Sequence, residues 1–435
     1  MLSRILRGEF ALGLTSSLLL RGFGACLSLL VSIVLARLLG VEGFGTYAYC
    51  LAIVTLLAVP AQFGIGTVLV RFCAAYQSQQ EWSLLKGLLR WSNKIVVISS
   101  LGLVLLAAVI FWTLPRLRPD GDDLTLWLAL LMLPIYALGE LRAAALRGFR
   151  RFVLGQLPEL VVRPVGLLVI LATMSRFDAA SQLSAASAMA AYLAASIVAF
   201  LLGAWWLWRA LPPSVNSASG KTDVPTWRNA VGVLSVTRGG RVVLSRIDVI
   251  VVGALIGAEA AGIYRVASTL AGVLGFGLSA VNAVSAPFFS RMHAIKDRAQ
   301  LRKLLVASSI ISLILAIPIA GALVGYGSTV LTLVYGEAFS AAYVPLLVLL
   351  VGQFVNAAAG SAGAFLNMTG QERWSLFAVI IALGISTPSY FLLVPKFGVI
   401  GAAGVTSGAL AMLNIILGIK AWMSFTAESQ VRNQL

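Results

Sequence analysis

The sequence predicts an all-α integral membrane protein of twelve transmembrane helices, arranged as two six-helix lobes that repeat in parallel. Composition, the spacing of apolar runs and an internal repeat predict it. Of the 435 residues, 60% are hydrophobic and only 11% are charged, whereas a soluble domain is about 45–50% apolar and about 25% charged. A soluble enzyme is therefore excluded, and at about 20 residues per span the chain has room for roughly twelve crossings.

Apolar runs separated by charged or turn residues define the expected spans. They lie near residues 11–36, 44–70, 94–114, 124–146, 154–174, 184–208, 229–256, 261–289, 304–325, 341–366, 373–394 and 399–422. The longest linker, 211–228, is rich in Pro, Ser and Gly. It divides the chain into an N-terminal lobe (1–210), a cytoplasmic linker and a C-terminal lobe (229–435).

The distribution of basic residues predicts the orientation in the membrane. The chain has 32 Lys and Arg against 16 Asp and Glu, a net charge of +16. With the N-terminus in the cytoplasm, 21 of the basic residues, Arg142 among them, fall in cytoplasmic segments and 5 on the opposite side. Basic residues gather on the cytoplasmic side of membrane proteins, so both termini are expected there and nucleic acid is not an expected partner.

The two halves of the chain share a sequence repeat. An offset of 217 pairs residues 21–47 with 238–264, and eleven of the 27 positions are identical, including Arg21/Arg238, Gly40/Gly257 and Tyr47/Tyr264. Apolar composition alone would not match an arginine and a tyrosine. Because each half holds an even number of spans, the repeats are expected to be parallel, with a ligand site at their interface.

Six arginines fall inside the predicted spans. They are Arg21, Arg163, Arg238, Arg241, Arg246 and Arg265. An arginine at the centre of a membrane helix costs about 2.5–3.5 kcal/mol on insertion scales, so each needs water, an acidic partner or a ligand. Arg21 and Arg238 occupy equivalent repeat positions, roughly 15 Å from the cytoplasmic face at 1.5 Å per residue, and are expected to face the cleft between the lobes.

Helical geometry groups the arginines of the seventh span. If 229–256 is one continuous helix, then Arg238, Arg241, Ser245 and Asp248 share one polar face, and Arg246 points toward a neighbouring helix or the edge of the cleft. Guanidinium groups match the oxygens of a diphosphate. Candidate substrate-binding residues are therefore Arg21, Arg238, Arg241, Arg246 and Arg265. The alternative is that these arginines pair with acids and lock helices together.

Three intramembrane carboxylates are candidates for ion coupling: Glu140, Glu159 and Asp248. Glu159 and Arg163 are four residues apart, a spacing that favours an ion pair within one helix, with Pro158 and Pro164 bending that helix. Gln353 and Asn356 could contact a sugar, although hydrogen bonds between helices are their more ordinary role. No catalytic or metal-binding motif is found, so neither an enzyme nor a cofactor is expected.

Several stretches in order along the chain carry a family resemblance. They include the segments LARLLGVEGFGTY (35–47), LRGFRRF (146–152), SRID (245–248) and NMTGQE (367–372). This pattern resembles polysaccharide-biosynthesis flippases of the multidrug/oligosaccharidyl-lipid/polysaccharide exporter superfamily. The resemblance implies a V-shaped transporter that works by alternating access, with arginines of both lobes, here Arg21, Arg238 and Arg265, lining its cavity.

The resemblance also implies an activity. The expected substrate is an undecaprenyl-diphosphate-linked oligosaccharide for O-antigen (lipopolysaccharide), capsule or exopolysaccharide assembly, moved from the cytoplasmic to the periplasmic leaflet of the bacterial inner membrane. Transport would be coupled to an ion gradient or the membrane potential. Expected partners are membrane lipids and polysaccharide polymerase or assembly proteins. One rival is a multidrug or cation exporter, which would want carboxylates in the cleft. Another is a membrane enzyme acting on the same lipid carrier, which would need a large outer loop or acidic catalytic residues.

Overall fold

The protein is helical throughout the part that the structure, a computed structural model, describes: residues 2–115, 118, 123–176 and 183–432. The chain divides into two compact units, Met1–Ser235 and Val236–Leu435. The division falls after the predicted linker 211–228, which therefore belongs to the first unit.

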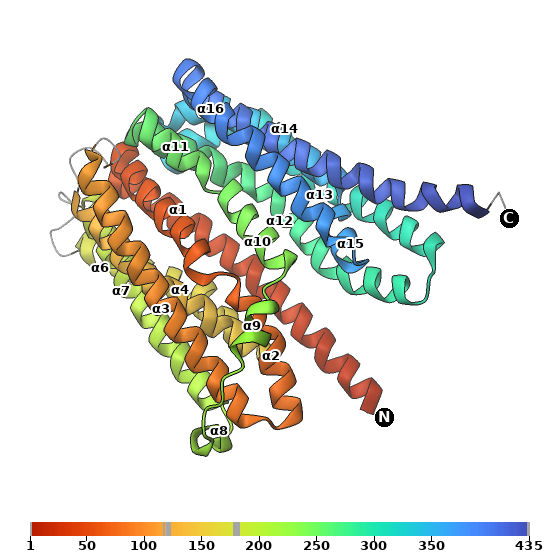
Figure 1. The fold of residues 1–435 in the computed structure, drawn as a ribbon. Coiled ribbons are helices and arrows are strands. Elements are labelled where there is room, and N and C mark those ends of the chain that lie inside the picture. Colours follow the sequence, from red (N-terminus) through yellow and green to blue (C-terminus); the bar gives the residue numbers. More distant parts are fainter. Residues whose placement is uncertain (1, 116–117, 119–122, 177–182, 433–435) are drawn as a thin grey trace. The chain divides into compact units, whose positions relative to one another are not determined.

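The first unit is a bundle in which α4 packs against α7, α2 and α1 (Figure 1). Its elements are α1 (Leu2–Gln62), α2 (Ile65–Gln79), α3 (Trp82–Thr113), α4 (Asp123–Gly148), α5 (Phe152–Leu157), the π-helical turn η2 (Pro158–Val162), α6 (Arg163–Arg176), α7 (Ala185–Ala210), α8 (Pro213–Ser217) and α9 (Val224–Asn229). Figure 1 shows the long helices of this unit, α1, α3, α4 and α7, each running for many turns.

The predicted linker is fastened to the helices of the first unit. Trp227 is fully buried and donates its indole N–H to the hydroxyl of Tyr76 at 2.9 Å. The Lys86 Nζ donates to the backbone carbonyls of Asn216 (2.6 Å) and Ala218 (2.9 Å). A composition rich in Pro, Ser and Gly indicates a loop, but these buried contacts hold it in one place.

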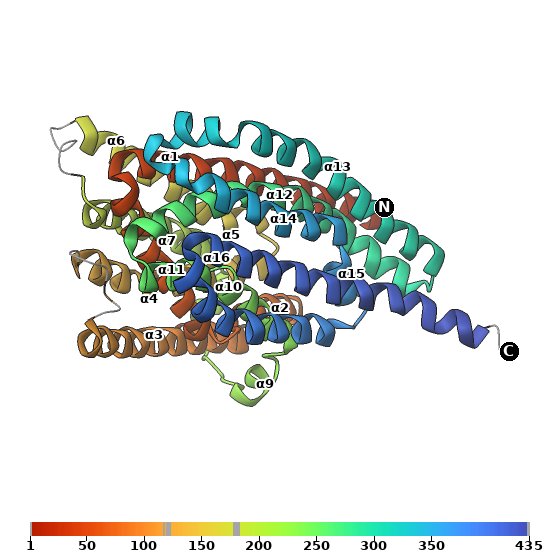
Figure 2. The same cartoon turned by 90° about the horizontal axis from the view of Figure 1, so that it is seen from above.

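In the second unit, α16 makes its most extensive contact with α14 (Figure 2). The elements of this unit are α10 (Val233–Leu244, which begins at the end of the first unit), α11 (Ile247–Leu255), α12 (Ala258–Ala294), α13 (Arg298–Val330), η4 (Leu331–Tyr335), η5 (Glu337–Ala342), α14 (Tyr343–Ala359), α15 (Ala362–Met368) and α16 (Glu372–Arg432). Phe365 packs between Phe289 and Phe425 in its core, edge-to-face against the Phe289 ring (centroids 5.6 Å apart) and tilted against the Phe425 ring (5.3 Å).

Nine helices in the described residues are long and apolar enough to cross a membrane. Two of them, α1 and α16, each cover two predicted spans, on either side of a glycine with non-helical backbone, Gly40 or Gly398. The predicted span 229–256 corresponds to two shorter helices, α10 and α11. The chain is thus a multi-pass membrane protein, and the count of twelve spans stays a prediction.

The matched glycines of the repeat adopt similar backbone conformations. Gly40 has φ 68° and ψ −173°, and Gly257 has φ 122° and ψ 177°. This region of φ/ψ space is essentially restricted to glycine. Both glycines separate consecutive helices, and the matched Tyr47 and Tyr264 that follow them are buried. The shared glycine is therefore needed for a sharp helix-to-helix turn at the matched position of each unit.

Candidate substrate-binding site

A cavity of about 300 Å³ lies within the second unit, enclosed by residues of α10, α11, α12, α14 and α16. Its polar wall includes Arg241, Ser245, Asp248, Arg265, Ser268 and Gln353. The remaining wall is mostly leucine and alanine. Two guanidiniums, hydroxyls and an amide beside an apolar surface form a site suited to an amphipathic anion.

The helix that supplies this wall is broken, contrary to the sequence prediction of one continuous helix over 229–256. Helix α10 ends at Leu244 and α11 begins at Ile247, with Arg246 in a non-helical conformation (φ −133°, ψ −25°) at the start of α11. Angles counted at 100° per residue do not hold across such a break. Arg241, Ser245 and Asp248 nevertheless line the same cavity, whereas Arg238, the fourth member of the expected polar face, is not among the lining residues.

The carboxylate in this wall is held by a chain of hydroxyl groups. Asp248 Oδ2 accepts a hydrogen bond from the Tyr264 hydroxyl at 2.8 Å, and its Oδ1 accepts from the backbone N–H of Val249 at 2.8 Å. The Tyr264 hydroxyl also lies 2.6 Å from Thr406 Oγ1, which lies 2.8 Å from the hydroxyl of Tyr390. Asp248 is 4% exposed. This network joins α11, α12 and α16 at the edge of the cavity.

The other predicted arginines of this unit differ in place. Arg265 lines the cavity from α12, and both Arg265 and Arg246 are close enough to Asp248 for their charges to act on it. Arg246 is half-buried, and Arg238 is exposed on α10. Neither Arg238 nor Arg246 is among the residues lining the cavity. The structure therefore brings together Arg241 and Arg265 of the predicted set.

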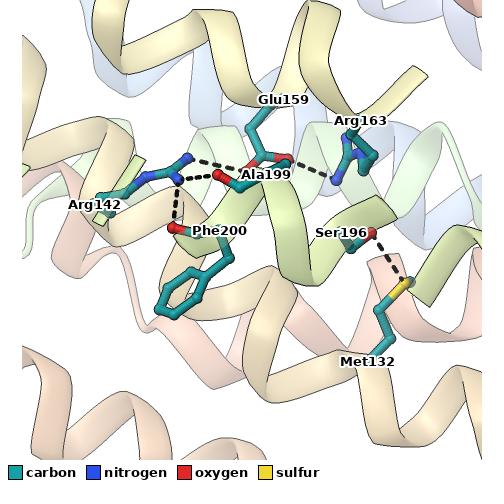
Figure 3. A network of polar contacts seen from close by, with 7 residues as sticks. All are labelled: Met132, Arg142, Glu159, Arg163, Ser196, Ala199 and Phe200. Atoms are coloured by element: carbon teal, nitrogen blue, oxygen red, sulfur yellow. Dashed lines mark hydrogen bonds and ion pairs between the residues drawn. The ribbon is translucent and has the colours of Figure 1, made fainter. Parts of the chain in front are cut away.

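The first unit contains an ion cluster, and one of its arginines, Arg142, also lines a cavity of about 350 Å³ (Figure 3). Glu159 Oε2 lies 2.7 Å from the Arg163 guanidinium, which confirms the predicted pair, and its Oε1 lies 3.1 Å from the Arg142 guanidinium. Arg142 also donates to the carbonyls of Ala199 (2.9 Å) and Phe200 (3.2 Å) on α7. One carboxylate thus bridges two arginines and joins α4, η2 and α6.

Aromatic rings and a second acid complete this cluster. The Arg163 guanidinium lies 5.7 Å from the ring centre of Tyr136 and 5.3 Å from that of Tyr192, distances typical of cation–π contact. Half-buried Glu140 is close enough for its charge to act on both Arg142 and Arg163. Two acids and two arginines give a cluster without net charge.

Arg142, counted above among the cytoplasmic basic residues, has a side chain that is only 3% exposed and lies inside the bundle. Gly203 of α7 makes room for it, since a Cβ at that position would overlap the Arg142 guanidinium. Its partner Glu159 lies 17 residues away on another element, so no local pattern reveals the pair. The signal available was that Arg142 falls within the predicted span 124–146.

Arg21 lies apart from this cluster and has a neutral partner. It is exposed on α1, and its Nε donates to Gln156 Oε1 at 2.9 Å. Gln156 is buried on α5, one turn before Glu159. Among the described side chains, neither Arg21 nor Arg241 forms an ion pair.

Comparison with known proteins gives one family match and one curated relative. Residues 11–293 match the family described as polysaccharide biosynthesis protein. The chain is 23% identical over 408 residues to the probable low-salt glycan biosynthesis flippase Agl15 of Haloferax volcanii. The aligned region covers 91% of this chain and 79% of that protein.

Solved structures show the same fold at low identity. An inward-facing multidrug resistance MATE family transporter of the MOP superfamily aligns with a TM-score of 0.78 at 14% identity, covering 95% of this chain and 96% of that one. The lipid II flippase MurJ in an inward closed conformation aligns with a TM-score of 0.71 at 15% identity, covering 95% and 90%. A MOP superfamily transporter from Pyrococcus furiosus, described as having a binding pocket of reversed polarity, aligns with a TM-score of 0.63 at 12% identity, covering 95% and 96%.

Proposed function

The chain belongs to the polysaccharide biosynthesis protein family and is a membrane transporter rather than an enzyme, and on that premise we propose that it is a flippase for polyprenyl-diphosphate-linked oligosaccharide. The observation that carries the proposal is the cavity of the second unit, where Arg241 and Arg265 face one space beside hydroxyls and an amide. The relative Agl15 is named a probable glycan biosynthesis flippase, which agrees with a lipid-linked glycan as substrate.

The diphosphate is the group that the arginines would recognise. Arg241 and Arg265 would bind it from the cavity wall. Arg21 and Arg238, at exposed positions of the two repeats, would attract it by their positive charge. Arg246, at the start of α11, would add to the positive electrostatic potential. The prenyl chain would stay in lipid, because moving it from one apolar environment to another gains no hydrophobic free energy. The polar wall from Ser245, Ser268 and Gln353 suits the hydroxyl groups of the first sugars.

Transport would proceed by alternating access of two six-span lobes, with both termini in the cytoplasm of a bacterial inner membrane and undecaprenyl as the carrier. Binding of the diphosphate would drive the change only if one state binds it more tightly than the other. Arginines contributed by both repeats satisfy that requirement if they converge on the ligand in one state and separate in the other. Polysaccharide polymerase and assembly proteins would receive the product.

Asp248 is the favoured site for coupling to an ion gradient. Both oxygens of Glu159 bind guanidiniums, and Glu140 lies beside the same cluster. These two carboxylates therefore compensate the charges of Arg142 and Arg163. Asp248 instead lines the cavity and is hydrogen-bonded by the Tyr264 hydroxyl rather than by an arginine. In proteoliposomes, Asp248→Asn is expected to abolish stimulation of transport by an imposed sodium or proton gradient. Stimulation equal to that of the unaltered protein would remove Asp248 from this role.

A multidrug or cation exporter is the rival function, favoured by the single carboxylate of Asp248 in the cavity wall. Two guanidiniums share that wall with one carboxylate, so the cavity lacks the excess of acidic groups that would bind an organic cation. Export of ethidium by cells that express the protein would support the rival.

The test of the proposed function is the sidedness of the diphosphate-linked glycan in cells that lack the gene. We expect the glycan to accumulate on the cytoplasmic leaflet, and the intact gene to reverse this. Arg21→Ala and Arg238→Ala at native expression should fail to do so, whereas Arg176→Ala, an exposed arginine at the end of α6, should succeed. Full complementation by both Arg21→Ala and Arg238→Ala would refute binding by the symmetric arginines.

A further inference from the structure

Two hydrogen bonds indicate the orientation of the Gln156 side-chain amide. Its Nε2 donates to the carbonyl of Phe152 at 3.2 Å, one turn earlier on α5, and its Oε1 accepts from Arg21 Nε at 2.9 Å. The residue is 8% exposed. Because the amide nitrogen is occupied by Phe152, the oxygen is the atom that faces the arginine.

The helix carrying Arg21 approaches this segment closely. Gly24, one turn after Arg21 on α1, lies so near Leu160 that an added Cβ would stand 2.9 Å from the Leu160 Cβ. Leu160 belongs to η2, the π-helical turn that begins at Pro158. Proline has no N–H to continue the α-helical pattern, and π-turns are frequent at functional sites. The close approach at Gly24 brings Arg21 within reach of Gln156.

Gln156 and Glu159, one turn apart, differ in the charge that they present to an arginine. Glu159 supplies a carboxylate to Arg142 and Arg163 and cancels charge there. Gln156 supplies a neutral oxygen to Arg21, so it directs the guanidinium without cancelling its charge. A carboxylate at position 156 would accept the same hydrogen bond and would convert the contact into an ion pair.

We propose that Gln156 is a positioning residue for substrate: it holds the Arg21 guanidinium by Nε, leaves the two terminal nitrogens for an anion, and keeps the positive charge available to the diphosphate. This inference rests on the proposed function, because it assumes that Arg21 binds the diphosphate of a lipid carrier. It adds a residue that contacts Arg21 rather than the substrate.

The test measures binding of farnesyl diphosphate, a short polyprenyl diphosphate, to the purified full-length protein in lipid nanodiscs. Gln156→Glu is expected to weaken binding about ten- to a hundredfold, because the charge of Arg21 is then neutralised. Gln156→Leu, which removes the orienting oxygen but adds no charge, should weaken binding less, by about threefold to tenfold. Gln62→Glu, which adds the same charge to the same unit at a half-buried side chain of α1, should bind like the unaltered protein.

A merely structural role predicts the opposite order of effects. Gln156→Glu keeps and strengthens the bond between α5 and α1, so a structural residue would tolerate it better than Gln156→Leu. The exchanged pair Arg21→Gln with Gln156→Arg guards against misfolding as an explanation. The exchanged pair places the guanidinium at position 156 and its amide partner at position 21. This double variant should bind farnesyl diphosphate more tightly than Arg21→Gln alone.

The outcomes separate the inference from the proposed function. If the unaltered protein does not bind farnesyl diphosphate, recognition of a diphosphate is refuted, and the role of Gln156 with it. If the unaltered protein binds and Gln156→Glu binds equally well, the positioning role alone is refuted. Binding lost in Gln156→Glu and regained in the exchanged pair would establish it.

Discussion

In the first unit, Glu159 lies between Arg142 and Arg163 at 3.1 and 2.7 Å, and Glu140 stands beside them. In the second unit, Arg241 and Arg265 face a cavity whose one acid, Asp248, is bound by the Tyr264 hydroxyl. Both units place arginines beside a cavity, since Arg142 lines one of about 350 Å³ in the first unit, but Arg142 binds a carboxylate directly, whereas Arg241 forms no ion pair among the described side chains. The partners of an intramembrane arginine, and not its presence, therefore indicate whether it awaits a ligand.

The largest expected effect is on the ion cluster of the first unit. Glu159→Gln would leave two guanidiniums without their carboxylate inside the bundle, and breaking a buried ion pair in this way costs about 3–5 kcal/mol. We expect a markedly lower thermal unfolding temperature and poor expression. Glu81→Gln, at an exposed acid before α3, is the control and should unfold like the unaltered protein. An unchanged unfolding temperature for Glu159→Gln would show that the cluster does not stabilise the first unit.

The space around Arg142 gives the second test. Gly203→Ala would place a methyl group against the Arg142 guanidinium, and overpacking of this kind costs about 1–3 kcal/mol. Gly102→Ala on α3 is a matched control, because an added Cβ there meets no atom within 4 Å. Equal thermal stability of the two variants would contradict the tight fit of Arg142 against α7.

The hydroxyl network of the second unit should show an effect of similar size. Tyr264→Phe removes the hydroxyl that bonds both Asp248 and Thr406, and leaving such buried groups unpaired costs about 1–3 kcal/mol. Thermal unfolding in detergent measures the loss, with Tyr326→Phe, at an exposed tyrosine of α13, as the control. If both variants keep the unaltered unfolding temperature, the network does not hold α11, α12 and α16 together.

The smallest effect on stability is expected where the effect on transport is large. Arg241→Gln removes a charge that forms no ion pair among the described side chains, so its free energy of unfolding should change by less than about 1 kcal/mol. Transport of the lipid-linked glycan should nevertheless be lost. Arg209→Gln, at an exposed arginine whose guanidinium lies 4.3 Å from the Trp205 ring centre, should retain transport. A stability loss in Arg241→Gln as large as that of Glu159→Gln would remove the contrast between the two units.

Local patterns predicted the features that depend on nearby residues. The Glu159–Arg163 ion pair follows from a spacing of four residues on a helix, and the structure confirms it. The matched Gly40 and Gly257 follow from the repeat, and both have backbone angles that only glycine readily adopts. Tyr264 is also a matched position, so the repeat could have singled it out as structurally important.

Features that depend on distant residues could not be predicted in this way. The pairing of Arg142 with Glu159 joins two elements whose contact no spacing reveals. The break between α10 and α11 occurs at Ser245 and Arg246, a pair with no proline or glycine to mark it. The network through Thr406 depends on α16 packing beside α12, which only the tertiary structure shows.

The most direct test of the central claim uses purified protein in proteoliposomes that carry a fluorescent polyprenyl-diphosphate-linked oligosaccharide in both leaflets. Movement between leaflets is measured by the fraction of the label that a membrane-impermeant quencher reaches over time. We predict rapid movement with the unaltered protein and with Arg209→Gln, and movement no faster than in empty vesicles with the double variant Arg241→Gln/Arg265→Gln. Movement at the unaltered rate in that double variant would contradict the claim that the cavity of the second unit binds the transported lipid.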